Sequence, residues 1–377
     1  MGGLYLHIPF CRNKCIYCDF YTGGERIADW NLYINCILNE LEERKTELPS
    51  PLTTLYIGGG TPSLIPSEFF SRLIHGLRRF GVFNKLTEFT VEVNPEDITD
   101  EKINIWKESG VDRVSIGVQS LNNDELNRLK RRHDMVMAEE AIKKLNRSFG
   151  NVSVDVMYGI PGQTLETYSE TLKKIIDLHP SHISAYSLML EKGTAMTLLV
   201  EQGKISLPNE DEWELLCELT ETKLEDGGYE RYEISNYSLP GMYSRHNLSY
   251  WQGKPYLGLG PGAHSYDGSN LRRWNPNDIK GYFQRYEYSK QNLRSFYSEE
   301  RLSREEMVEE AIMTGLRTVE GLNLALFEEK FGMKDKEKIL QKSARYKEGQ
   351  LLKEEKGYLS FTRKGFRVSD MILSDLI

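Results

Sequence analysis

The sequence predicts a mixed α/β protein whose first half is a partial (βα)6 barrel, similar to an incomplete TIM barrel. Short β-rich runs alternate with longer helical patterns from about residue 4 to residue 188. Most of these runs are apolar or β-branched on both faces, as expected where a barrel interior and an outer helical layer cover both sides. Glycine-rich and polar residues directly follow the runs, at the strand ends where barrel proteins carry their sites.

Six runs predict strands, over Leu4–Ile8, Thr53–Ile57, Glu88–Val93, Arg113–Val118, Val152–Met157 and His182–Leu188. The helices expected between them cover Asp29–Lys45, Ser67–Phe80, Asp100–Glu108, Asn123–Lys130, Met135–Phe149 and Thr164–Leu178. Gly110 follows one of these helices and suits the left-handed conformation of a helix end. Six repeats favour an open partial barrel over a closed eight-fold one.

The alternation stops near Met189, which predicts three parts of the chain. These are the partial barrel over residues 1–190, a connecting α+β segment over 191–290 and a C-terminal module over 291–377. The connecting segment is irregular and carries one clear helix, over Asp211–Asp226. The module has expected helices at Ser303–Leu316, Leu324–Phe331 and Asp335–Glu348, followed by a hairpin over 349–362, which is typical of a winged-helix-like domain. Its weak basic charge favours a structural or partner-docking role over DNA reading.

Composition narrows the class of protein. A net charge of −8 argues against a general nucleic-acid binder. Five cysteines, three of them in one cluster, do not form a disulfide framework. Neither a secretory-signal pattern nor an apolar run of about 18 residues is found. These observations predict a cytoplasmic protein that binds no nucleic acid.

The strongest signal is the loop after the first strand, where Cys11, Cys15 and Cys18 are spaced C-x3-C-x2-C. Thiolates select iron–sulfur clusters, zinc or Cu(I). Zinc needs a fourth ligand at a defined distance, whereas Cys36 and Cys217 are isolated in helical stretches. Three thiolates fit a [4Fe–4S] cluster with one iron left open. A structural zinc knuckle and unliganded thiols are the alternatives.

This cysteine loop resembles the signature of the radical S-adenosylmethionine (radical SAM) superfamily, in which SAM occupies the open iron. The resemblance implies the same partial-barrel architecture and SAM as a second cofactor. Glycines let backbone groups approach a ligand closely, and a carboxylate accepts hydrogen bonds from an amino group or a ribose. The candidate SAM residues follow the predicted strands or flank the cysteines: Tyr5, Tyr17, Gly59, Gly60, Thr61, Glu92, Gln119, Arg131 and Asp155. Each, taken singly, is equally well explained as a structural residue.

Four segments resemble the coproporphyrinogen oxidase-like branch of that superfamily: Tyr5–Cys11, Gly58–Ser63, Gly117–Ser120 and Gly159–Thr164. The branch contains the oxygen-independent coproporphyrinogen III oxidases and the HemW heme chaperones. The oxidases carry a further cysteine at the position of Phe20 and a long extension before the cluster, whereas ten residues precede Cys11 here. An HNxxYW motif, typical of the chaperones, begins at His246. The resemblance therefore favours the chaperone family.

The HNxxYW motif supplies the candidate heme residues His246, Tyr250 and Trp251. Imidazole is a common iron ligand, and aromatic rings offer flat faces for a porphyrin. Without the resemblance, core packing of the motif is the preferred interpretation, and with it heme contact is preferred. Candidate partners of the propionates are Arg245, Arg272 and Arg273. His264 is a reserve ligand, and His7 and His133 are interpreted as structural.

The resemblance implies a heme chaperone that binds a [4Fe–4S] cluster, SAM and heme and delivers heme to acceptor proteins, membrane-bound respiratory subunits among them. It also suggests a homodimer. No residue is assigned a catalytic role, and whether SAM is cleaved stays open. The alternatives are an enzyme that oxidatively decarboxylates coproporphyrinogen III and a degenerate barrel that serves only as a scaffold.

Overall fold

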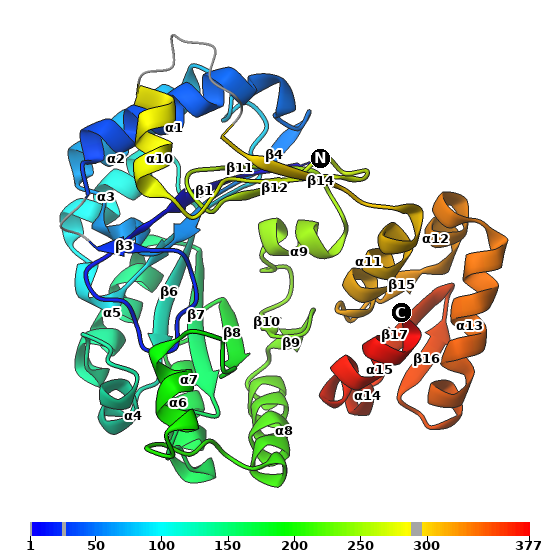
Figure 1. Ribbon diagram of the computed structural model, residues 1–377. Helices are drawn as coiled ribbons and strands as arrows, with labels where there is room; N and C mark the ends of the chain where they lie inside the picture. Colours follow the sequence, from blue (N-terminus) through cyan, green and yellow to red (C-terminus); the bar gives the residue numbers. More distant parts are fainter. Residues whose placement is uncertain (1, 25–27, 288–295) are drawn as a thin grey trace.

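The computed structural model describes residues 2–24, 28–287 and 296–377 and shows a mixed α/β fold built on a curved sheet (Figure 1). Six parallel neighbours form its centre: β1 (Gly2–Ile8), β4 (Leu52–Gly59), β5 (Glu88–Val93), β6 (Arg113–Gln119), β7 (Asn151–Tyr158) and β8 (His182–Ser187). All six predicted strands are confirmed. Their carboxyl ends meet at one edge of the sheet, as the sequence predicted.

The sheet continues past both ends of this parallel set. Beside β1 lie β11 (Tyr256–Leu259, parallel) and then the antiparallel strands β12 (His264–Tyr266), β13 (Leu271–Trp274) and β14 (Ser298–Arg301). Beside β8 lie β10 (Asn236–Ser238) and β9 (Glu230–Arg231). The sheet therefore crosses the boundary predicted at residue 190, because the connecting segment supplies β11, β12 and β13 at one end and β10 and β9 at the other. The outermost strand, β14, lies in the range predicted for the C-terminal module and yet belongs to the barrel sheet. The boundary predicted at residue 290 lies outside the described residues.

Helices cover the outer face of the sheet (Figure 1). They are α1 (Trp30–Arg44), α2 (Ser67–Arg78), α3 (Asp100–Ser109), α4 (Asn123–Arg128), α5 (Met135–Ser148) and α6 (Leu165–Asp177). Short 3-10 turns at Lys45–Glu47, Pro62–Leu64 and Pro95–Asp97, and the small strands β2 (Phe10–Cys11) and β3 (Gly23–Gly24), complete the loops. Gly110 ends α3 with a φ of 94°, which confirms the predicted helix end.

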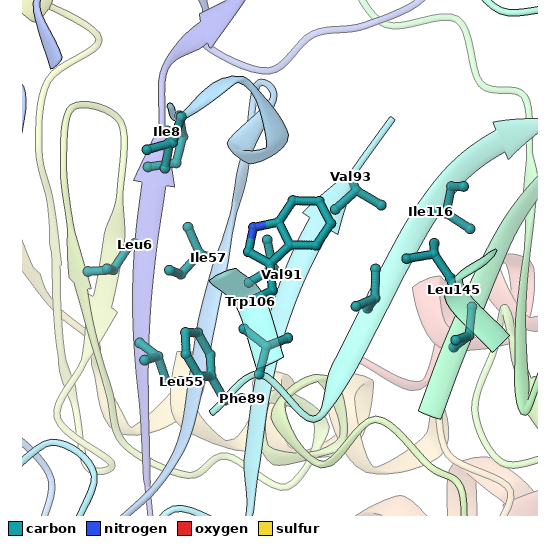
Figure 2. Close-up of a cluster of buried hydrophobic side chains, with 14 of the residues drawn as sticks. Leu6, Ile8, Leu55, Ile57, Phe89, Val91, Val93, Trp106, Ile116 and Leu145 are labelled. Carbon is teal, nitrogen blue, oxygen red and sulfur yellow. The ribbon is translucent and has the colours of Figure 1, made fainter. Parts of the chain in front are cut away.

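Figure 2 shows part of the hydrophobic core that lies between the sheet and its outer helices. Leu6, Ile8, Leu55 and Ile57 are buried there with Trp106 of α3. Each such side chain contributes roughly 1.5–3 kcal/mol by leaving water. Because alternate residues of a strand point to opposite faces, the intervening residues of these strands face the inside of the barrel.

The connecting segment also contributes α7 (Ala195–Glu201), α8 (Glu210–Asp226), α9 (Arg245–Trp251) and α10 (Ile279–Glu287). The predicted helix at Asp211–Asp226 is confirmed as α8. Helix α9 lies between the open side of the sheet and the C-terminal domain, and α10 lies beside α1 (Figure 1).

The C-terminal domain has its own hydrophobic core. It contains α11 (Arg304–Leu316), α12 (Leu324–Phe331) and α13 (Met333–Glu348), with a sheet of β15 (Leu322–Asn323), β17 (Tyr358–Phe361) and β16 (Leu352–Glu355). The three helices and the hairpin predicted for this module are confirmed. Two short helices, α14 (Arg363–Arg367) and α15 (Ser369–Leu376), were not predicted. Across the described residues, every helix is too short or too polar to span a bilayer.

Candidate cluster, SAM and heme sites

The three cysteines of the predicted cluster line one cavity of about 450 Å³ at the carboxyl ends of the strands. Cys11 ends β2, whereas Cys15 and Cys18 lie in the following turns, with the Cys18 N–H donating to the Cys15 carbonyl at 3.2 Å. All three thiols are partly exposed. Burial raises the pKa of Cys18 to about 11 and also raises that of Cys11. Metal binding would therefore release protons from these thiols.

Neighbouring residues hold the cysteine loop against the sheet. The Thr61 hydroxyl donates to Cys11 Sγ and the Arg131 guanidinium to Cys15 Sγ, each at 3.3 Å. A Cβ on Gly60 would lie 3.0 Å from Cys11 Sγ and 2.8 Å from the Phe10 carbonyl. Glycine at this position thus allows the close approach of the two loops.

The donor set of this cavity fits an iron–sulfur cluster. Among the described residues, no three His, Cys, Asp or Glu side chains converge closely enough to hold one metal ion. A single zinc ion needs its ligands gathered around one point, whereas each cysteine of a cluster binds a different iron. Three thiols in one cavity, two of which accept a hydrogen bond, supply the donor set that a [4Fe–4S] cluster with one open iron requires.

Two of the carboxyl groups that line this cavity, Glu92 and Asp155, have raised pKa values. Glu92 accepts hydrogen bonds from the Tyr56 hydroxyl at 2.7 Å and from the Gly59 N–H at 3.0 Å. Burial raises the pKa of Glu92 to about 7 and that of Asp155 to about 6. Asp155 also accepts from the Ser115 hydroxyl at 3.1 Å. Both groups suit a ligand that brings a positive charge or hydroxyl groups to this surface.

Polar atoms without partners also point to a ligand in this cavity. Gln119 has a left-handed backbone (φ 70°), and its buried Oε1 has no partner among the described residues. Arg131 is held by Asn94 Oδ1 at 2.8 Å and by the Gly117 carbonyl at 2.6 Å, while its buried Nε is unpaired in the described part of the chain. Buried polar groups are almost always hydrogen-bonded, so a bound polar molecule is the expected partner.

Eight of the nine predicted SAM residues line this cavity, namely Tyr17, Gly59, Gly60, Thr61, Glu92, Gln119, Arg131 and Asp155. Tyr5 is outside the lining, because its hydroxyl is paired with His7 Nδ1 at 3.0 Å and its ring lies beside Tyr56. The cavity is also lined by Asn94, Ser115 and Tyr186, to which the sequence analysis assigned no role. Like the predicted SAM residues, all three are polar residues on or just after a strand of the parallel sheet, so this feature of the sequence could have identified them.

A second cavity, of about 970 Å³, lies between the barrel and the C-terminal domain. Barrel-side residues that line it include Tyr232, Tyr250, Trp251, Tyr256 and Arg272, and the C-terminal domain supplies residues from α11 and α12. Among the described lining residues, none is a histidine or a cysteine. The cavity shares no lining residue with the cysteine cavity in the described ranges.

Helix α9 carries the HNxxYW motif and is anchored at its first turn. The Ser244 side chain accepts from the Asn247 N–H, and Glu88 Oε2 and Oε1 accept from the N–H groups of Arg245 and His246 at 2.7 and 3.0 Å. A carboxylate at a helix start meets both the free N–H groups and the helix dipole favourably. Glu88 thus fixes α9 to the start of β5.

His246 is 1% exposed and does not line the second cavity. Its Nδ1 is paired with the Thr54 hydroxyl and its Nε2 with the Tyr250 hydroxyl, both at 2.8 Å, and its ring stacks on Tyr56. Burial, together with the charge of Arg113, lowers the pKa of His246 to about 3. Of the three predicted heme residues, Tyr250 and Trp251 line the cavity, whereas His246 is a neutral imidazole behind Tyr250.

The remaining candidate heme residues, three arginines and one histidine, also differ in whether they line the second cavity. Arg272 lines the second cavity, paired with Glu310 at 2.6 Å. Arg273 is instead paired with Glu47 and Glu299, and Arg245 donates to the Thr87 carbonyl. His264 is exposed on β12 and stacks on Trp274, outside both cavity linings.

The structural roles expected for His7 and His133 agree with their contacts. His7 Nε2 pairs with the Tyr21 carbonyl at 3.0 Å. His133 pairs with the Val118 carbonyl at 3.0 Å and lies 3.4 Å from Glu96.

Comparison with known proteins agrees with the fold and the cysteine cavity. The model of the radical SAM superfamily matches residues 5–175, and that of the HemN C-terminal domain matches residues 302–368. The fold is shared with coproporphyrinogen III oxidase (HemN) from Escherichia coli, a radical SAM enzyme, with a TM-score of 0.82 at 22% identity over 100% of this chain and 89% of that one. The chain is therefore a radical SAM protein with a HemN-type C-terminal domain.

Two relatives with known names identify the family within the radical SAM superfamily. The heme chaperone HemW of Lactococcus lactis is 33% identical over 374 residues, which cover 99% of this chain and 96% of that protein. HemW of Bacillus subtilis is 35% identical over 88% of this chain and 87% of its own. The chain belongs to the HemW heme chaperone family, which confirms the family predicted from the sequence.

Proposed function

We propose that the protein is a heme chaperone that binds heme between its barrel and its C-terminal domain and passes it to acceptor hemoproteins. The observation that carries this proposal is the second cavity, which is lined by Tyr250 and Trp251 of the HNxxYW motif and is separate from the cysteine cavity. Its volume of about 970 Å³ is at the upper end of the range of ligand sites, roughly 300–1,000 Å³.

Within this proposal the cysteine cavity holds a [4Fe–4S] cluster on Cys11, Cys15 and Cys18 and SAM beside it. When bound, a reduced cluster supplies the electron that cleaves SAM, and heme carriage does not require that step. The chain's own residues would orient SAM. The Gly59 N–H and the Tyr56 hydroxyl hold the Glu92 carboxyl group, which keeps further lone pairs to accept from SAM, while Gln119 and Arg131 offer unpaired polar atoms within the described residues.

The second cavity offers the groups that a porphyrin needs. Tyr250 and Trp251 provide flat apolar faces, and Arg272 provides a cation for a propionate, in exchange for its present partner Glu310. Separation of the two domains would expose heme bound between them and make it accessible to an acceptor protein. The acceptors, with membrane-bound respiratory subunits among them, and a homodimeric, cytoplasmic state are part of the same proposal, supported by the family resemblance and by the need of thiolates for a reducing compartment.

The second candidate function is oxidative decarboxylation of coproporphyrinogen III, which is favoured by the fold shared with E. coli HemN. Phe20 argues against this decarboxylase function. This residue, 58% exposed at the rim of the cysteine cavity, occupies the position of the further cysteine expected in the oxidases. The two functions differ in one measurable way, since a carrier binds heme without turning over its precursor.

The test is an anaerobic hemin titration of cluster-reconstituted protein, followed at the Soret band, with a coproporphyrinogen III assay on the same sample. Saturable one-to-one binding without turnover is the expected result. Trp251→Ala should weaken binding, whereas Tyr346→Ala, which removes an aromatic of the C-terminal domain outside the cavity lining, should not. Absence of saturable binding in the wild type, or turnover of coproporphyrinogen, would overturn the proposal.

A further inference from the structure

We propose that Tyr250, not His246, is the protein ligand of the heme iron, and that His246 is a positioning residue that holds the Tyr250 phenol. This inference rests on the proposed function, because it places heme in the cavity between the barrel and the C-terminal domain. The described lining of this cavity contains neither histidine nor cysteine, so the imidazole and thiolate ligands common in heme proteins are absent from the described surface. Met307 also lines the cavity, but its soft, neutral thioether suits ferric iron less well than an anionic oxygen ligand does.

Tyrosine, which ligates heme iron as a phenolate in some proteins, is the best-represented ligand type in this lining. The cavity tyrosines are Tyr232, Tyr243, Tyr250, Tyr256, Tyr266 and Tyr358. Their hydrogen-bond partners distinguish them. Tyr256 and Tyr358 have no side-chain hydrogen bond in the described structure, so neither has a neighbour placed to donate to a phenolate. Tyr266 donates to the Ser269 carbonyl at 2.8 Å and Tyr243 lies 3.5 Å from a Glu230 oxygen. Such partners only accept hydrogen bonds and therefore oppose a phenolate.

Tyr232 also meets an imidazole, that of His182 at 2.8 Å, but it is only 7% exposed. Its oxygen already receives the Ser244 N–H at 3.2 Å, at the first turn of α9. Iron ligation there would disturb the start of the helix that carries the motif. Tyr250 is partly exposed and carries no such second bond in the described structure.

The hydrogen bond between Tyr250 and His246 suits a phenolate because the imidazole Nε2 can act either as an acceptor or as a donor. In the ligand-free protein a Tyr250 O–H that donates to Nε2 leaves Nδ1–H to donate to Thr54. In the other neutral tautomer, Nε2–H donates to the phenolate while the Thr54 hydroxyl, which is both donor and acceptor, donates to Nδ1. His246 thus stabilises either state of the phenol without becoming charged, in agreement with its burial beside Arg113.

The ligation step balances without any change of oxidation state. A bond forms between ferric iron and the Tyr250 phenolate oxygen, and the phenol O–H bond breaks. A water molecule leaves the iron, and one proton goes to solvent. His246 remains neutral before and after. Release would follow the reverse order, with a proton and a water returning when heme passes to an acceptor.

Spectroscopy of the ferric hemin complex tests this ligand directly. The wild type should show the phenolate-to-iron charge-transfer band and the high-spin EPR signal of a tyrosinate complex. Tyr250→Phe should still bind hemin and lose the band completely. Tyr256→Phe, which removes a neighbouring cavity phenol whose ring packs on Tyr250 at 4.6 Å, should keep it. His246→Gln should keep the phenolate ligand and shift the band, because the hydrogen bond to the phenolate changes.

The possible failures are distinguishable. If the wild type shows no saturable hemin binding, the proposed function fails. If the wild type binds hemin with a low-spin histidine-type spectrum that His246→Ala abolishes, or with a phenolate band that Tyr250→Phe leaves intact, only the assignment of Tyr250 fails. If Tyr250→Phe does not fold, the wild-type spectrum decides, since absence of the phenolate band overturns the assignment.

Discussion

Glu92 is a carboxyl group that burial keeps about half protonated at pH 7 in the ligand-free protein. Its pKa is raised to about 7, although Tyr56 and the Gly59 N–H both donate to it. In the unfolded chain the same carboxyl group has the ordinary glutamate pKa of 4.5. The folded protein therefore binds this proton more tightly, and this contribution to stability is lost as the pH rises from 4.5 to 7.

We expect Glu92→Gln to reduce the pH dependence of stability, because the amide has no proton to lose. Relative to the wild type, the variant should gain about 2 kcal/mol in unfolding free energy between pH 5 and pH 8. Denaturant unfolding of the ligand-free proteins at the two pH values measures this. Glu42→Gln, which changes an exposed carboxylate paired with Lys45, is the control and should follow the wild type. Parallel pH profiles of Glu92→Gln and the wild type would contradict the assigned pKa.

Thr61 offers a second test, directed at the cluster. Its hydroxyl donates to Cys11 Sγ at 3.3 Å, and hydrogen bonds to sulfur are among the features that set cluster potentials. Thr61→Val keeps the shape and removes the donor, so the reduction potential should become more negative. A redox titration followed by EPR measures the shift. Thr53→Val removes a hydroxyl that donates to the Gly2 carbonyl and should leave the potential unchanged; an unchanged potential in Thr61→Val would refute the role of the hydroxyl.

The cysteine cavity was predictable at the level of residues because parallel strands bring their carboxyl ends together. Arg131 is the instructive case, since its position after a short helix gave no sign of its contact with Cys15, 116 residues away in sequence. The environment of His246 was not predictable. Its partner Thr54 lies 192 residues away, and its burial depends on a helix and a cavity wall from parts of the chain without a periodic pattern.

Helix α9 shows how one short element depends on a single side chain. Seven residues, Arg245–Trp251, are too few for a helix to be stable alone, and Glu88 accepts two N–H groups of its first turn. A short, Gly-flanked segment gave no helical signal in the sequence. The same holds for β11, whose Tyr256–Leu259 run is four residues long and contains a glycine. Helices such as α5 and α13 were predicted well because they are long and carry a periodic apolar pattern.

Glu88→Ala should therefore loosen α9 and the cavity wall that it forms. Two N–H groups lose their acceptor, and we expect a loss of about 1–3 kcal/mol in stability together with weaker hemin binding. Denaturant unfolding and a hemin titration of the same preparation measure both. Asp134→Ala removes the cap of α5, a helix that contributes no described residue to the cavity, and should cost about 1 kcal/mol with little effect on hemin. Unaltered hemin affinity in Glu88→Ala would show that α9 does not depend on this anchor.

The two large parts of the molecule are joined by a buried carboxylate. Glu221 of α8 is 1% exposed and binds Arg231 of the barrel sheet at 2.8 Å, with Arg367 at 2.9 Å and Arg363 at 3.1 Å from the C-terminal domain. Arg317 of the C-terminal domain lies over the Trp251 ring at 5.7 Å. The wall of the second cavity thus depends on how this domain sits on the barrel.

Glu221→Ala should weaken the docking of the C-terminal domain, because it leaves three arginines without their common partner. Removal of one partner from a buried ionic group typically costs about 3–5 kcal/mol. Glu225→Ala is the matched control, since this carboxylate also binds Arg363 but is 45% exposed, and it should cost below about 1 kcal/mol. Denaturant unfolding gives the energies, and limited proteolysis reports domain separation. Equal effects of the two substitutions would show that the buried cluster does not hold the domains together.

Two separate cavities in one chain predict that SAM and heme bind together. Equilibrium dialysis of cluster-loaded protein with labelled SAM, during a hemin titration under anaerobic conditions, measures this most directly. We expect one hemin per chain to bind while the bound SAM stays constant, because the described linings of the two cavities share no residue. Displacement of SAM in proportion to bound hemin would mean that both ligands compete for one site, and it would contradict the placement of heme between the barrel and the C-terminal domain.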